Sequence, residues 1–430
     1  METSVHGITA PSAVYEIAER RFEIGTRGFA EAIADAHAAR QRPRCMCLGG
    51  YDGRGIEMYV ARLGDGYIVK RMPETGSHHT PDCPSYEPPA EFSGLGQVLG
   101  SAITEDPATG ETTLKLDFPL IKMPGHSQTP PAGGASDSVS SDGTKLSLRG
   151  LLHYLWDQAE LTRWHPGFAG KRTWATVRKH LLQAAEHKLT RGSALRARLY
   201  VPEPFAIDQR DAINARRLAQ WQHAVAAPRK PQHLVLMIGE VKEIVPARYG
   251  FKAIVKHVPD QGFAVDEHLF RRLGRQFNQE LSLWGATDKL HMIMIATLAM
   301  NGSGLPAVVE LSLMPVTSQW LPVKDCYDLE LVERLERDGR SFIKALRYNL
   351  QKEQVLANAI LTDAPDSPVP LFIAMSSVSG EDADSKLDPS PATDKQPKWI
   401  WQPWHGPMPP LPSRSYGPRT LLDTSVMHRA

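Results

Sequence analysis

The sequence predicts a multi-domain α+β protein with an N-terminal zinc-binding β-hairpin module, a central helical, winged-helix-like segment and a C-terminal, mostly antiparallel α+β domain. Three observations predict this arrangement. Three of the four cysteines flank an alternating stretch at 56–71, leucines recur at helical spacing over 148–159, and paired apolar runs fill 233–374. Pairs of strand-like runs between helices favour an antiparallel sheet over a doubly wound parallel sheet.

The N-terminal segment is expected to support the hairpin. Residues 11–40 have the pattern of one helix or two short helices, broken near 25–28. The stretch that follows alternates apolar and polar residues on both sides of 64–66, which is the pattern of a β-hairpin. Because the two strands of a hairpin return to the same end, the chain before and after the hairpin should meet there.

Four metal-ligand side chains would meet at that end: Cys45, Cys47, His79 and Cys83. Three thiolates and one imidazole suit tetrahedral zinc and leave no position for water, which indicates a structural site. His78 is the alternative fourth ligand, and His79 is preferred because its short gap to Cys83 suits a tight loop. Three reduced cysteines without a metal, or a disulfide, are the other interpretations.

Composition restricts the partners. The chain has 430 residues, of which 42% are apolar, and a formal net charge of +1, so no overall field attracts it to nucleic acid or to a membrane. Its start shows no basic region before an apolar run, and no stretch approaches about eighteen apolar residues, which predicts a cytoplasmic protein without membrane contact. Cys326 is interpreted as a small buried apolar residue and not as a nucleophile.

A helical segment is expected after a Pro-, Gly- and Ser-rich connector at 124–145. Ser147 is a candidate N-cap for a first helix and Thr173 for a second, and a strand-like run follows at 194–201. Helix, turn, basic helix and strand is the order of a winged-helix module, whose second helix would enter a DNA major groove.

Positive charge is concentrated in this segment. From residue 145 to residue 201, eleven Lys or Arg residues stand against three acidic residues, an excess that would neutralise phosphates and make binding salt-dependent. The residues expected to contact phosphate are Arg172, Arg178, Lys179, Arg196 and Arg198. The alternative is an ordinary solvated face of a helix pair. Trp156, Trp164 and Trp174 are interpreted as core residues and not as base-stacking platforms.

One constellation in the α+β domain resembles a catalytic motif. Glu240 and Lys242 lie two residues apart on an apolar strand, as in nucleases of the restriction-endonuclease type, where two carboxylates hold Mg²⁺ and the lysine steadies the attacking water. Asp208 is the nearest upstream candidate for the second carboxylate. Alternation of Glu240 and Lys242 on a solvated strand face is the other interpretation.

The chain after Met375 differs from the rest. A polar, acidic stretch precedes Trp399, Trp401 and Trp404, which stand among prolines. We expect a disordered tail with an extended segment that docks in the groove of a protein partner, or that folds back on its own domain. The expected divisions are 1–123 for the zinc module, 124–145 for the linker, 146–230 for the helical segment, 231–375 for the α+β domain and 376–430 for the tail.

Short motifs are spread along the middle of the chain. They are Cys45-x-Cys47, Met58-Tyr59, Lys70-Arg71-Met72-Pro73, His79-x-Pro81-Asp82-Cys83-Pro84, Leu148-Arg149-Gly150-Leu151-Leu152-His153-Tyr154-Leu155-Trp156, Trp164-His165-Pro166, Val201-Pro202-Glu203-Pro204, Gly239-Glu240-Val241-Lys242 and Leu346-Arg347-Tyr348-Asn349. Together, over about residues 40–375, they resemble the bacterial family labelled domain of unknown function 1173. The resemblance implies a setting on integrative and conjugative elements and plasmids, and it implies no reaction or ligand.

These observations lead to one main hypothesis and two alternatives. The main hypothesis is a cytoplasmic, zinc-stabilised accessory protein of a mobile genetic element that binds nucleic acid, with DNA as the first choice, and has no catalytic activity. The first alternative is a Mg²⁺-dependent nuclease that uses Glu240 and Lys242. The second is a scaffold that docks protein partners through its C-terminal tail.

Overall fold

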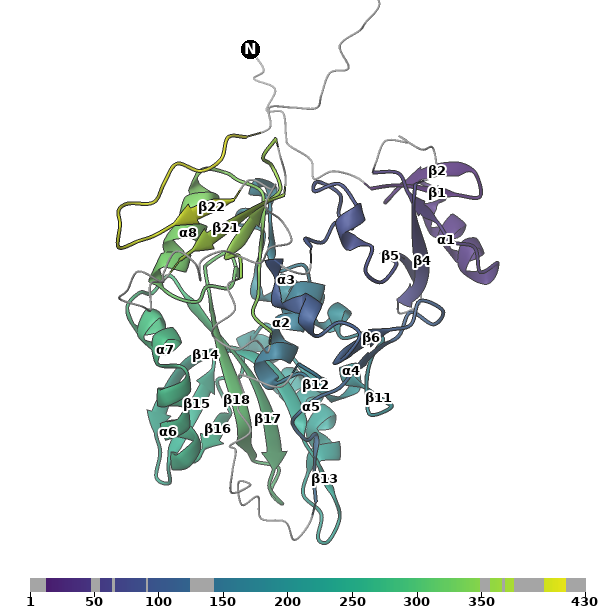
Figure 1. Cartoon of the computed structure of the whole chain (residues 1–430). Coiled ribbons are helices and arrows are strands. Elements are labelled where there is room, and N and C mark those ends of the chain that lie inside the picture. The colour runs from purple at the N-terminus through teal and green to yellow at the C-terminus, as the bar shows by residue number, and fades with distance from the viewer. Residues whose placement is uncertain are drawn as a thin grey trace, which may run out of the picture.

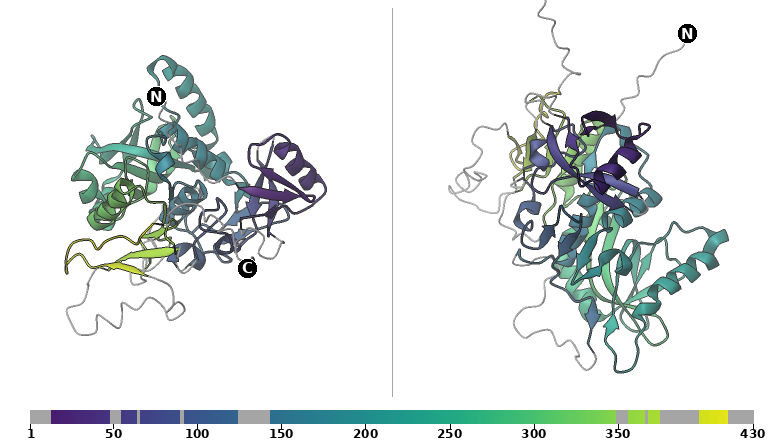
Figure 2. Two further views of the ribbon diagram at one scale, coloured as in Figure 1. Left: turned by 90° about the horizontal axis from the view of Figure 1, so that it is seen from above. Right: turned by 90° about the vertical axis from the view of Figure 1, so that its right-hand side faces the viewer.

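The computed structural model describes residues 13–47, 55–63, 66–89, 92–123, 143–348, 356–365, 368–374 and 398–414 (Figure 1). Within these residues the protein is a mixed α+β structure with several sheets, as predicted. The N-terminal module lies at one side of the main body, and helix α5 (Arg210–Trp221) projects outward from the main body (Figure 2). The predicted linker falls almost entirely outside the described residues.

The N-terminal module is a five-stranded antiparallel sheet in the order β2-β1-β3-β4-β5, with one helix packed on it. Its elements are β1 (Val14–Ile17), β2 (Arg20–Glu23), α1 (Phe29–Ala38), β3 (Arg44–Cys45), β4 (Ile56–Leu63) and β5 (Gly66–Arg71). The β4–β5 pairing confirms the predicted hairpin. The prediction of helix at 14–23 is wrong, because these residues form a second hairpin whose turn residues, Ala18 and Glu19, have positive φ angles of 49° and 62°.

The centre of the protein is a closed barrel. Its strands are β14 (Val235–Pro246), β15 (Phe251–Val255), β16 (Gly262–Val265), β17 (His291–Met300) and β18 (Pro306–Val316). They pair in the order β14-β15-β16-β18-β17, and a further pairing of β17 with β14 closes the ring. All neighbours are antiparallel except β16 and β18, which are parallel. Helices α6 (Glu267–Gln276) and α7 (Asn278–Gly285) connect β16 to β17.

Two helices cover one outer side of this barrel. They are α2 (Leu148–Gln158) and α3 (Trp174–Ala184), and their predicted N-caps are confirmed: Ser147 accepts from the Gly150 amide at 3.1 Å and Thr173 from the Thr176 amide at 3.4 Å. Their apolar faces share one hydrophobic core with residues 95–120 and with the outward residues of β14, β17 and β18. The predicted boundary at 124–145 therefore does not separate two hydrophobic cores.

The chain after α3 also differs from the winged-helix prediction. The predicted strand over 194–201 is interrupted by a helical turn. Its pieces are β11 (Ser193–Ala194), α4 (Leu195–Arg198) and β12 (Leu199–Tyr200), which pairs with β14. The preceding strand, β10 (Lys188–Thr190), pairs with β7 (Thr112–Leu114) from the far side of the connector. The remaining short strands are β6 (Ile103–Glu105), β8 (Ile121–Lys122) and β13 (Gln232–His233).

The C-terminal region is a sheet in the order β22-β21-β20-β19-β9, beside helix α8 (Cys326–Arg337). Its strands are β9 (Arg163–Trp164), β19 (Phe342–Lys344), β20 (Ala359–Leu361), β21 (Val369–Ile373) and β22 (Trp399–Trp401). The prediction of a disordered tail is therefore wrong for 398–414, because β22 joins the sheet and buries Trp399 and Trp401. The rest of the predicted tail lies outside the described residues.

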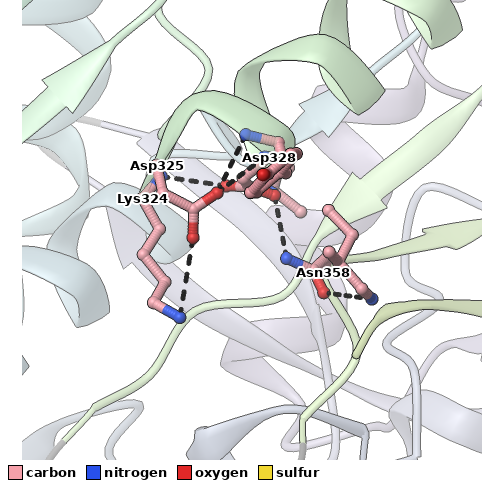
Figure 3. A network of polar contacts seen from close by, with 7 residues as sticks. Lys324, Asp325, Asp328 and Asn358 are labelled. Carbon is pink, nitrogen blue, oxygen red and sulfur yellow. Dashed lines mark hydrogen bonds and ion pairs between the residues drawn. The ribbon is translucent and has the colours of Figure 1, made fainter. Parts of the chain in front are cut away.

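A buried polar network fastens α8 to this sheet (Figure 3). Asp328 accepts from the Lys344 ammonium at 2.6 Å, from the Asn358 amide at 3.1 Å and from the Lys324 main-chain amide at 2.9 Å. The side chains of Asp328 and Lys344 are only 4% and 3% exposed. A buried charge that keeps all its partners is tolerated, but one left without its partner is costly.

We predict that Asp328→Ala lowers the free energy of unfolding by about 3–5 kcal/mol, because it leaves the Lys344 charge buried and unpaired. Lys324→Ala is the matched control, since Lys324 is 54% exposed and lies 3.7 Å from Asp325. Loss of a surface pair of this kind should cost about 0–1 kcal/mol. Urea titrations of both variants measure the difference, and equal losses would show that the buried pair has no special role.

Candidate metal centre

The four predicted ligands lie together beside the N-terminal sheet. The ligand atoms of Cys45, Cys47, His79 and Cys83 are all within 4.8 Å of one another. The Cys45 and Cys83 sulfurs are 3.7 Å apart, and the His79 Nδ1 lies 3.4 Å from the Cys47 sulfur and 3.6 Å from the Cys83 sulfur. Zinc with Zn–S bonds of about 2.3 Å at tetrahedral angles needs S–S edges of about 3.8 Å and S–N edges of about 3.6 Å. The observed separations match these edges.

Each ligand is positioned by a defined local structure. Cys45 ends β3, opposite Tyr15 of β1 and Ile56 of β4, so the sheet register fixes the first ligand. Cys83 closes a turn through its amide, which donates to the Thr80 carbonyl at 2.8 Å, and the Ser85 amide points at its sulfur from 3.4 Å. Amides directed at a sulfur stabilise its thiolate form.

The choice between the two histidines is also settled by position. His79 is 3% exposed and belongs to the cluster, whereas His78 is exposed and does not. The disulfide alternative does not apply to this structure, because the cysteines are free and the nearest sulfurs are far beyond the bond length of about 2.05 Å. The fourth cysteine, Cys326, was predicted to be buried, and this prediction is wrong: it lies exposed at the first position of α8.

The three thiols do not ionise independently. The pKa of the Cys45 thiol is raised, chiefly because it hydrogen-bonds to the Cys47 and Cys83 sulfurs and because it is buried. The pKa of the Cys47 thiol is lowered, because it accepts from Cys45, from Cys83 and from His79. A cation placed among such sulfurs favours the thiolate form of all three.

The residues of the predicted catalytic motif lie apart from each other. Glu240 is 3% exposed and accepts from His291 Nδ1 at 2.6 Å, with Lys256 as a second partner. Burial raises its pKa, but these two partners outweigh burial, so the pKa is lowered overall. Lys242 is exposed at a bulge of β14, between Val241 and Glu243.

In the described part of the chain, Glu240 belongs to no group of three or more metal-ligand side chains. There, the cluster of three cysteines and His79 is the only group of three or more His, Cys, Asp and Glu residues close enough to hold a metal. Asp208 lies exposed in a short 3₁₀ turn, outside that group. The described residues thus hold no larger ligand cluster at Glu240 or Asp208, and the two-carboxylate Mg²⁺ site and the cleavage activity stay predictions.

Several of the predicted phosphate contacts have intramolecular roles. Arg172 donates to the carbonyls of Leu161 at 3.1 Å and Gln319 at 3.3 Å, and burial lowers its pKa to about 10. Arg178 donates to the Val201 carbonyl at 3.0 Å.

The other three residues of that set differ among themselves. Arg198 contacts His233 Nδ1 at 2.9 Å, Arg196 lies 3.4 Å from Glu186, and Lys179 is exposed. The three tryptophans of this region, Trp156, Trp164 and Trp174, are 0%, 5% and 5% exposed, which confirms that they belong to the core.

The sequence did not indicate the surroundings of Glu240. His291 comes from β17 and stacks on Trp320, with ring centroids 4.4 Å apart, while Trp174 stacks on His257 at 5.3 Å. These residues come from four separate parts of the chain, so no spacing rule connects them. Knowledge of the β14–β17 pairing would have been needed to find the Glu240–His291 contact.

Among the described residues, none of the helices has the length and apolar character needed to span a membrane.

Comparisons with known proteins give one match. Neither the curated proteins nor the solved structures include a match to this chain. A protein family described as "Protein of unknown function (DUF1173)" matches residues 15–404. The match extends beyond the predicted 40–375 and takes in β22, and on this basis the chain belongs to the DUF1173 family.

Proposed function

We propose that this protein binds nucleic acid through its five-stranded barrel, and that a structural zinc ion holds its N-terminal module. The order of the barrel strands carries the first part of this proposal. With β14, β15, β16, β17 and β18 as strands one to five, the ring order is one, two, three, five, four, with three and five parallel. This is the connectivity of an OB-type Greek-key barrel, whose second and third strands bind oligonucleotides or oligosaccharides.

The fold alone does not decide between an oligonucleotide and an oligosaccharide. The charge of the barrel surface favours one of them. Between residues 242 and 256, which span the end of strand one, its loop and strand two, four Lys or Arg residues stand against one acidic residue. Lys256 is paired with Glu240, so Lys242, Arg248 and Lys252 carry the excess against Glu243. This excess of positive charge does not attract a neutral sugar, whereas it does attract a phosphate backbone. The basic helical segment at 145–201 adds positive charge to the same molecule.

The proposed zinc ion is structural because four protein ligands complete its tetrahedron. The residues Cys45, His79 and Cys83 are 0%, 3% and 4% exposed, and Cys47 is half-buried. With all four bound to the ion, no position is left open for a substrate. Metal binding at such a site contributes directly to folding, since the unfolded chain holds no preformed site. The small core of this module, which is built from a few short strands and one helix, needs that contribution.

The two alternatives receive less support. A nuclease that uses Glu240 and Lys242 would need a free carboxylate, whereas Glu240 is buried and bound by His291 and Lys256. A scaffold that docks partners through the tail would have to release Trp399 and Trp401 from the sheet. The setting on a mobile genetic element stays a prediction.

We predict one zinc ion per chain in the wild type and less than half of that in Cys83→Ala, because the variant cannot complete the tetrahedron. His78→Ala is the matched control, since His78 neighbours a ligand but is exposed. Elemental analysis of the purified proteins measures the metal, and hydrogen exchange of the β4–β5 amides measures whether the module unfolds. Equal zinc in wild type and Cys83→Ala would end the zinc assignment.

We also predict that binding to nucleic acid weakens steeply with salt. If roughly three to four phosphates of a single strand are neutralised, affinity should fall about 20- to 50-fold between 50 and 200 mM salt. Fluorescence anisotropy with labelled single-stranded and duplex DNA and RNA measures this. Absence of binding to all four at low salt, or binding that ignores salt, would refute the proposed function.

A further inference from the structure

We infer that the exposed face of β15 and β16 binds single-stranded nucleic acid, with Lys252 and Arg248 against phosphates and Tyr249 stacked on a base. This inference rests on the proposed function and adds to it the class of ligand and the residues that hold it. It is carried by the strand register, by the shape of the face and by the loop between β14 and β15.

The face is a row of small exposed residues beside one lysine. Lys252 lies opposite Ala264 of β16, and Ala264 lies opposite Ala307 of β18. All three are exposed, whereas Ala253 and Phe263, which point into the barrel, are buried. The two alanine side chains leave a low surface over β16 and β18, so an extended chain can lie across these strands beside Lys252 without steric hindrance.

Gly262 gives the lysine its place on this face. A Cβ atom at Gly262 would lie 2.3 Å from Lys252 Cδ and 2.7 Å from its Cγ, so the lysine stem lies directly over this glycine. The aliphatic part of Lys252 therefore packs on the sheet while its ammonium group reaches solvent, as long basic side chains do at surfaces. A phosphate crossing the alanine row would meet this group.

The loop before β15 presents an aromatic ring at the same region. Tyr249 is 81% exposed, and the Arg248 guanidinium lies 5.4 Å from the centre of its ring. The loop is a tight turn, closed by a bond of 3.0 Å from the Ala247 amide to the Gly250 carbonyl. Gly250 has a φ of 72°, and any Cβ there would lie 2.7 Å from the Val265 carbonyl oxygen, so the turn rests against the end of β16.

An exposed tyrosine on a closed turn is suited to stacking on an unpaired base. Neighbouring charges favour this ligand as well. Arg248, Lys252 and Lys242 project from the loop and the adjoining strands, beside the acidic Glu243. Two further acidic residues follow β16 next to Gly250: Asp266 accepts from the Leu269 amide as the N-cap of α6, and Glu267 is paired with Arg271. Asp260, in the next loop, is bound bidentately by Arg217 at 3.0 and 2.7 Å, so its charge is neutralised within the protein.

A duplex fits this protein less well. In a winged-helix protein the second helix would read the major groove, but here α3 turns Trp174, Val177 and Leu181 into the core. Two arginines at that helix, Arg172 and Arg178, donate to main-chain carbonyls instead. Bases in a duplex are stacked on one another, so an aromatic side chain cannot stack on them. Bases in a single strand can unstack and are then accessible to an aromatic side chain.

The test compares four full-length variants with the wild type by fluorescence anisotropy. The probes are a labelled 15-nucleotide poly(dT) strand and a 15-base-pair duplex, each measured at 50 and at 200 mM salt. We expect the wild type to bind the single strand at least tenfold more tightly than the duplex. Tyr249→Ala should weaken single-strand binding about 5- to 100-fold, and Lys252→Glu should weaken it and lower its salt dependence.

Two further variants are matched charge reversals elsewhere. Lys115→Glu changes an exposed lysine directly after β7, outside the barrel, and should leave binding unchanged. Lys179→Glu changes the exposed lysine of α3 and reports on the basic helical segment. Thermal melting checks that each variant folds, which we expect because Tyr249, Lys252, Lys115 and Lys179 are all exposed.

The outcomes separate the inference from the proposed function. If the wild type binds neither probe, the proposed function fails for DNA and the inference fails with it. If the wild type binds but prefers the duplex, or if Lys179→Glu loses binding while Tyr249→Ala and Lys252→Glu keep it, the inference fails and nucleic-acid binding stands. Loss with both barrel variants and retention with Lys115→Glu supports the inference.

Discussion

Strand β14 is the element on which the arrangement of the protein depends, because it hydrogen-bonds along both of its edges. Its first half pairs with β12 and β17, and its second half pairs with β15. The change of partner falls at the bulge between Val241 and Glu243, and a bulge adds twist that turns a strand from one side of a barrel to the other. Met237 points into the barrel while Ile238 points out toward α2 and α3, so both faces of this half are buried.

Features that depend on neighbouring residues could be predicted from the sequence. The β4–β5 hairpin follows from alternation around a Gly-containing turn, and Ser147 and Thr173 follow from their capping chemistry. The metal cluster is a special case, because it joins residues 38 positions apart. It could be predicted because a hairpin between the ligands brings distant residues together, and because sulfur and imidazole ligands limit the metals that fit.

Features that depend on distant pairing could not be predicted. The barrel closes through a single parallel pair, Ala264 with Ala307, and through β14 with β17, neither of which leaves a local pattern. The first hairpin turns at Ala18 and Glu19, which lack the Gly or Asn that marks such turns. For the aromatic segment at 398–414 the sequence leaves two interpretations open, a docking tail or a segment that folds back on its own domain, because prolines hide a three-residue strand. Its parallel pairing with β21 shows that it folds back.

The pattern of Glu240 and Lys242 shows why spacing alone can mislead. Two residues apart on a regular strand, they would share one face, but the bulge makes Lys242 the extra residue, and Glu240 is buried whereas Lys242 is exposed. Glu240 instead holds Lys256 and His291, and so ties the end of β15 to β17 across β14. A buried carboxylate with two such partners stabilises the junction where three barrel strands meet. This arrangement gives the residue a structural role in holding β15 in place, and the proposed binding face is built on that strand.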